Sequence, residues 1–120
     1  MYFDFITVYV PDVEKSLQFY NGILGLEILK RHPIEGGELA FVGVNGQPTI
    51  EFIGNPGNAG NTYNGFSIGI AVESLEDAVA LLERHGHPVI RGPISPDPST
   101  VFSYIKDSDG IEVQLIEHKE

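Results

Sequence analysis

The chain has 120 residues with 42% hydrophobic and 20% charged side chains, which suits one globular domain of ordinary composition. It contains no cysteine, which excludes disulfides, thiolate zinc sites and cysteine nucleophiles. Its formal net charge of −10 opposes contacts with phosphate backbones and anionic membrane surfaces, so neither nucleic acid nor a membrane is an expected partner. No leader-like segment and no long apolar run is seen, and a cytoplasmic location is expected.

The first half of the chain predicts a strand, a helix and three further strands. Residues 3–10 alternate with a period of two, which places Val8 and Val10 on one face of a strand. Asp12 is placed to cap a helix whose apolar residues recur at helical spacing until Gly25. Three short alternating runs follow, separated by Gly-rich and Asn-Gly turns, over residues 26–30, 38–44 and 49–53.

The second half predicts the same order of elements. A strand over residues 67–72 precedes Ser74, a helix cap, and the helix ends at His85-Gly86. The Pro-rich segment 92–99 is predicted to be a connecting loop. The remaining three strands are expected over residues 88–91, 101–106 and 112–117, with a turn at 107–110.

The two halves are related by an internal duplication. Val10 matches Val72, Val13 matches Leu75, and Glu14 matches Glu76, each at a separation of 62 residues. We therefore predict an α+β fold in which two tandem βαβββ modules form a curved mixed sheet around a groove. The expected organisation is a single domain over residues 1–120, with a module at 1–54, a linker at 55–65 and a second module at 66–120.

The groove should be lined by the strand residues that point away from the helices. By alternation these candidate ligand-binding residues are Phe5, Thr7, Tyr9, Glu51, Ser67, Glu112 and Gln114. Aromatic residues on or near these faces either form a wall for a planar ligand or fill the groove as core. The four histidines, His32, His85, His87 and His118, lie off the groove faces by the same alternation.

Three segments carry a family resemblance that covers almost the whole chain. They are the strand-helix run Ile6–Tyr20, the Leu24-Gly25-Leu26 sequence, and the turn Asp107-Ser108-Asp109-Gly110 with the strand after it. Together they resemble the vicinal oxygen chelate superfamily, the glyoxalase, bleomycin-resistance and dioxygenase group. The resemblance implies the two-module fold predicted above.

In metal-using members of that superfamily four equivalent strand positions hold the ion, and the resemblance places them at Phe5, Glu51, Ser67 and Gln114. Phe5 has no donor atom, Ser67 is a neutral hydroxyl, and Gln114 offers one amide oxygen. Transition-metal sites usually need two or three imidazole or carboxylate ligands. We therefore expect no cofactor, and keep a divalent metal as the alternative.

The first functional hypothesis is a metal-independent binder of the resistance or sequestration type. It would hold an aromatic or cationic small molecule in an apolar and acidic groove, as a homodimer. The alternative is a metal-dependent lyase, isomerase or dioxygenase resembling lactoylglutathione lyase, which would use Glu51 and Gln114, with Glu51 as the catalytic residue. A third is a regulatory or dimerising protein whose groove is filled by its own side chains. Ligand identity and the pairing of modules, within one chain or between chains, stay open.

Overall fold

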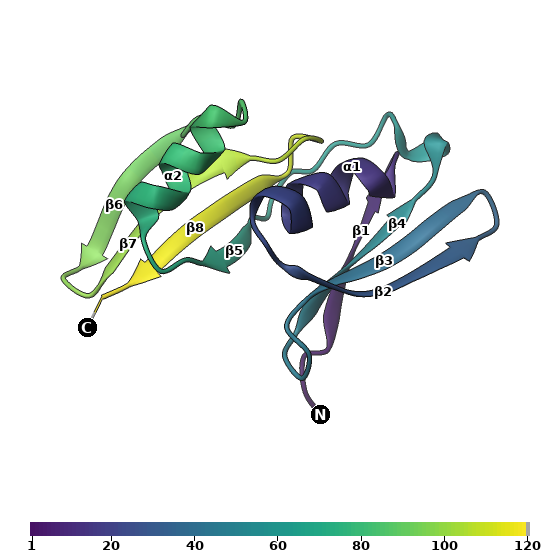
Figure 1. Cartoon of the computed structure of the whole chain (residues 1–120), viewed down its shortest axis with the longest axis horizontal. Helices are drawn as coiled ribbons and strands as arrows, with labels where there is room; N and C mark the ends of the chain where they lie inside the picture. Colours follow the sequence, from purple (N-terminus) through teal and green to yellow (C-terminus); the bar gives the residue numbers. More distant parts are fainter. Residues whose placement is uncertain (120) are drawn as a thin grey trace. The chain divides into compact units, whose positions relative to one another are not determined.

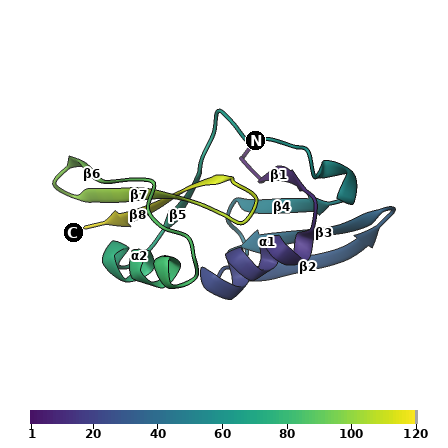
Figure 2. The ribbon, with the colours of Figure 1, turned by 90° about the horizontal axis from the view of Figure 1, so that it is seen from above.

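The computed structural model describes residues 1–119, so Glu120 of the predicted second module lies outside it. The chain forms two compact units, Met1–Thr62 and Tyr63–Glu120, called unit 1 and unit 2. Each has a four-stranded mixed sheet with a helix along one face (Figures 1 and 2). The strand orders are β1-β4-β3-β2 and β5-β8-β7-β6. The β1–β4 and β5–β8 pairs are parallel, and the other neighbouring strands are antiparallel. This arrangement confirms the predicted α+β fold.

Unit 1 begins with a strand and a helix, as predicted. The Asp12 side chain accepts a hydrogen bond from the Glu14 amide at 3.0 Å and so caps the helix. The ring centroids of Tyr20 and Phe52 lie 5.0 Å apart, and this contact joins the helical segment to the sheet. The elements are β1 (Phe5–Val10), α1 (Val13–Leu17), a π-helical segment η1 (Gln18–Ile23), β2 (Glu27–Ile34), β3 (Gly37–Gly43), β4 (Thr49–Gly54) and a 3-10 turn η2 (Pro56–Asn58).

The start of the predicted linker is bound to unit 1. The Asn58 side-chain amide donates to the Val10 carbonyl at 3.2 Å, and that of Asn61 donates to the Tyr9 carbonyl at 3.4 Å. These asparagines therefore anchor the segment after β4 to the end of β1.

Unit 2 repeats the arrangement around a second core. The Ser74 hydroxyl accepts from the Asp77 amide at 3.1 Å and caps the helix. One oxygen of buried Asp107 accepts from the amides of Asp109 and Ile111, at 2.8 and 2.9 Å, and fixes the predicted turn. The elements are β5 (Ile68–Ala71), α2 (Leu75–Arg84), β6 (Arg91–Asp97), β7 (Thr100–Lys106) and β8 (Glu112–His118).

The prediction for β6 was wrong in its position. The strand was expected at residues 88–91 and a loop at 92–99, but β6 runs from Arg91 to Asp97. It lies at the edge of its sheet, and it pairs with β7 through only three residues, with shifts of register between them. An edge strand tolerates Pro93 and Pro96 because an amide that faces solvent is not needed for pairing.

No helix within residues 1–119 is long and apolar enough to cross a bilayer.

Candidate functional site

The candidate site of unit 1 is the face of its sheet turned away from α1, called the open face. Val8 and Val10 are buried, whereas Thr7 alternates with them and points to the opposite side. In the sheet Thr7 lies beside Glu51, and Glu51 lies opposite Phe41. The predicted groove residues of β1 and β4 therefore share one face.

Glu51 is held at the centre of this face by its neighbour. The Thr7 hydroxyl donates a hydrogen bond to one carboxylate oxygen of Glu51, with an Oγ1–Oε1 distance of 2.7 Å. Both residues are half-buried. This contact fixes the orientation of the carboxylate and engages one of its two oxygens, so that the other can accept from a second group.

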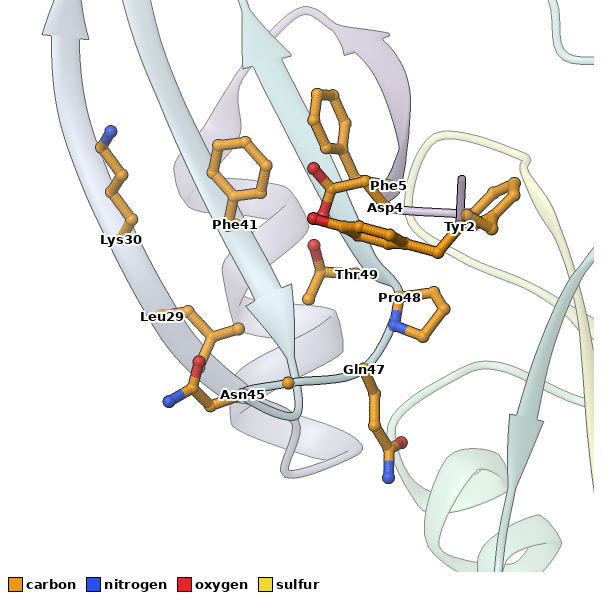
Figure 3. A pocket seen from close by; sticks show the side chains of 12 residues that line it. Tyr2, Asp4, Phe5, Leu29, Lys30, Phe41, Asn45, Gln47, Pro48 and Thr49 are labelled. Atoms are coloured by element: carbon orange, nitrogen blue, oxygen red, sulfur yellow. The ribbon is translucent and has the colours of Figure 1, made fainter.

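An aromatic pair stands beside this carboxylate. The rings of Phe5 and Phe41 meet edge to face, with centroids 5.2 Å apart and planes at 86°. They border a cavity of about 870 Å³, called the aromatic hollow, which is lined entirely by residues of unit 1. Tyr2 and Phe3 add two further rings, and Asp4 and Lys30 are the charged residues of the hollow (Figure 3). Its size falls in the range of sites for drug-sized molecules.

The structure brings to the open face residues that sequence analysis did not place there. Phe41 could have been predicted, because alternation along the predicted strand 38–44 places it on the face opposite to that of its buried neighbours Ala40 and Val42. Lys30 and His32 could not, because β2 carries a β-bulge between Ile28 and Lys30 that alternation does not reveal.

The bulge changes the face to which the end of β2 points. Beyond it Lys30 pairs with Phe41 and His32 pairs with Leu39, two residues of the open face. The prediction that no histidine lies on a groove face was therefore wrong for His32. His85 and His87 are anchored elsewhere, through contacts of their Nδ1 atoms with the carbonyls of Leu81 and Lys106 at 2.9 and 2.8 Å.

The corresponding face of unit 2 carries an ion pair. Gln114 lies between Gly69 and Tyr104 in the sheet, and Ser67 is exposed immediately before β5. Arg91 donates to the carboxylate of Glu112, and its guanidinium lies 4.1 Å from the ring centroid of Tyr104. The hydrogen bond to Glu112 raises the pKa of Arg91. Glu112, predicted to line the groove, thus has a cationic partner in its own unit.

The four positions that the family resemblance assigns to a metal ion belong to different units. Phe5 and Glu51 are in unit 1, and Ser67 and Gln114 are in unit 2. Their chemistry does not fit a transition-metal site, because they offer one carboxylate, one amide and one hydroxyl, and that carboxylate already accepts from Thr7. Within the part of the chain that the structure describes, no three His, Asp or Glu side chains are grouped to hold a metal ion.

Comparison with known proteins gives consistent results for sequence and fold. The model of the Glyoxalase/Bleomycin resistance protein/Dioxygenase superfamily matches residues 2–115. A probable lactoylglutathione lyase from Synechocystis sp. is 35% identical, over 90% of this chain and 88% of its own. Among solved structures, glyoxalase I of Leishmania major has a TM-score of 0.83 at 22% identity, covering 98% of this chain and 86% of the other.

A second solved structure has a different described role. TnmS3, an antibiotic binding protein from Streptomyces sp. CB03234, has a TM-score of 0.75 at 22% identity and covers 99% of this chain and 97% of its own. At these identities the structures show the shared fold alone, while the family match spans nearly the whole chain. The chain belongs to the Glyoxalase/Bleomycin resistance protein/Dioxygenase superfamily.

Proposed function

We propose that the protein is a metal-independent small-molecule binder of the resistance or sequestration type, and that its ligand stacks in the aromatic hollow. The observation that carries this proposal is the Phe5–Phe41 pair. Phe5 replaces a donor by an apolar ring at the first of the four metal positions of the family. Its side chain is 43% exposed beside a cavity of about 870 Å³, so a planar ligand would gain both burial and ring contacts.

The charges favour a ligand with a cationic or hydrogen-bond-donating group. Glu51, oriented by Thr7, lies on the same open face but does not line the hollow, so its second oxygen would accept only from a ligand that extends beyond the hollow. Asp4 adds a carboxylate in the hollow, and the net charge of −10 favours the approach of cations. Lys30 lies on the other side, on β2, where it would contact a polar end of the ligand.

The test is binding by a panel of cationic aromatic compounds, such as acriflavine, ethidium and bleomycin, followed by thermal shift and by calorimetry. A ligand should raise the melting temperature in a saturable manner. Phe41→Ala should weaken binding about tenfold, because it removes one ring of the stacking pair. Ile90→Ala, which removes an exposed apolar side chain of unit 2, should leave binding unchanged. A panel that gives no shift would contradict the proposal.

A second candidate is a metal-dependent lyase, and the 35% identity to a probable lactoylglutathione lyase favours it. In that case Glu51 and Gln114 would hold a divalent metal and Glu51 would be catalytic. Protein purified without chelator should then contain nearly one equivalent of transition metal and form lactoylglutathione. Less than about a tenth of an equivalent would favour the binder.

We further propose a cytoplasmic homodimer. The lack of cysteine suits a reducing compartment. The edge strand β1 carries exposed apolar side chains, including Ile6 at 39% exposure, which a second copy would cover. Light scattering coupled to size exclusion should give twice the mass of 13.1 kDa, and a monomer at all concentrations would exclude the dimer.

A further inference from the structure

A second cavity lies in unit 2, on the side of the sheet that carries α2. It measures about 680 Å³ and is called the flank hollow here. The helix supplies Glu76 and Val79, and β7 supplies Val101 and Ser103. The flank hollow is separate from the open faces of both sheets, so a ligand bound there is independent of the proposed function.

The register of the two sheets identifies the matching place in unit 1. Val8 lies beside Phe52, Phe52 beside Ala40, and Ala40 beside Arg31. The corresponding row of unit 2 runs from Ile70 through Leu115 to Ser103. On β6, Arg91 pairs with Tyr104 and Ile94 pairs with Phe102, so the row ends at the two residues between them, Gly92 and Pro93. Gly92-Pro93 therefore stand where unit 1 has Arg31. In the next row, Val101 and Glu117 stand where unit 1 has Glu38 and Gly54.

In unit 1 the place is filled by an arginine. Arg31 donates from Nε and Nη2 to the two carboxylate oxygens of Glu38, at 2.6 and 2.8 Å. Its Nη2 also donates to Glu14 at 3.0 Å. The hydrogen bonds to Glu38 and then Glu14 raise the pKa of Arg31, and the bond between Arg31 and Glu38 lowers the pKa of Glu38. One guanidinium thus joins the helix to the edge of the sheet.

In unit 2 the carboxylate remains and the cation is missing. Glu76 is the counterpart of Glu14, yet among residues 1–119 it has no cationic partner. Ser103 is only 2% exposed, lines the flank hollow, and makes no hydrogen bond through its hydroxyl to any residue of the described part. A hydroxyl that faces a cavity and has no protein partner can donate to or accept from water or a ligand.

The two units also differ at the strand position that faces the start of the helix. A Cβ atom at Gly54 would lie 2.4 Å from the Val13 side chain, so unit 1 packs its helix directly on β4. Unit 2 has Glu117 at this position, and one of its oxygens accepts from the Leu75 amide at 2.7 Å. The Glu117 side chain therefore joins β8 to the start of α2 and lines the flank hollow.

We propose that the flank hollow binds a small alkylguanidinium cation. Its planar donors would meet the carboxylate of Glu76 and the hydroxyl of Ser103, and its alkyl chain would lie on Val79. The other charged residues at the hollow are Glu83, Glu117 and Lys119, so carboxylates outnumber ammonium groups there. The ligand would occupy the space that Arg31 fills in unit 1.

The proposal is tested by titrating the isotope-labelled full chain with ethylguanidinium chloride and following backbone amide signals. Saturable shifts are expected at Val79 and Ser103. Glu76→Gln should weaken binding about fivefold, the effect of losing one solvent-exposed ionic contact. Glu14→Gln, the same change at the matched position of unit 1, should leave binding unchanged. Val101→Glu, which restores the counterpart of Glu38, should strengthen it several-fold.

Two comparison compounds separate guanidinium recognition from simpler effects. n-Propylammonium has the charge without the planar donors, and N-ethylurea has the planar shape without the charge. Both should bind at least threefold more weakly than ethylguanidinium. Equal binding of either compound, shifts that do not saturate, or shifts centred on the Arg31 side of unit 1 would overturn the proposal. Because Glu76 is exposed on the helix, its variant should fold even if Val101→Glu does not.

Discussion

Units 1 and 2 share a strand order and a helix position, but they use the two faces of their sheets in opposite ways. Unit 1 closes its helix side with Arg31 between two glutamates and leaves an aromatic hollow on its open face. Unit 2 leaves a hollow on its helix side, and its open face carries the Arg91–Glu112 pair beside Tyr104. Duplication has thus kept the backbone pairing while the side chains at matched positions have changed their partners.

The largest effect should come from closing the space that lets α1 pack on β4. In Gly54→Ala the new Cβ would lie 2.4 Å from the Val13 side chain and 2.8 Å from its backbone nitrogen. We expect a loss of about 3 kcal/mol in the free energy of unfolding, measured by urea titration. The matched change Glu117→Ala removes only the acceptor for the Leu75 amide and should cost about 1 kcal/mol. Equal losses would contradict the difference in packing between the units.

A smaller, stabilising effect is expected at Ser16. This residue is 2% exposed, and among residues 1–119 its hydroxyl is buried without a hydrogen-bond partner. Its counterpart 62 residues later is Ala78. Ser16→Ala should raise the free energy of unfolding by about 1 kcal/mol, because it removes a desolvated hydroxyl and adds helix propensity. A destabilised variant in calorimetry would show that the hydroxyl has a favourable partner.

The smallest effect should be the dependence of unit 1 on pH through Glu38. Its bond to Arg31 lowers its pKa below the ordinary value of 4.5, so the folded state favours the charged carboxylate. The stabilisation from this ion pair is fully present at pH values above the pKa of Glu38 in the unfolded chain. It is lost as the pH falls through the lower pKa of Glu38 in the folded protein. Glu38→Gln should therefore melt slightly below wild type at neutral pH, with the gap closing in acid. A gap that persists below pH about 3 would exclude the ionic cause.

Most of the fold could be predicted from the sequence, because it follows local rules. Alternation of apolar residues predicted that Val8 and Val10 share the buried face, and short polar side chains predicted the helix caps at Asp12 and Ser74. β6 was misplaced because Pro93 and Pro96 are typical of loops, and only pairing with a neighbour shows them to be in an edge strand. Pairing is a long-range property that the local pattern does not contain.

The candidate site could be predicted in part. The face shared by Thr7 and Glu51 followed from alternation, and the structure adds the hydrogen bond that joins them. Phe41 was within reach of the same rule, whereas Lys30 and His32 depend on one extra residue in β2 that reverses the faces. The ion pair of Glu112 with Arg91 needed the register of three strands. Whether these residues bind a ligand stays a prediction.

The prolines of β6 have one further consequence, for behaviour at high concentration. An exposed strand edge is a template on which another chain can add its own strand, and this is a common route to aggregation. Pro93 and Pro96 cannot donate backbone hydrogen bonds, and the irregular register of β6 interrupts the remaining donors. This edge of unit 2 is therefore a poor template, and it resists extension of the sheet from one molecule into the next.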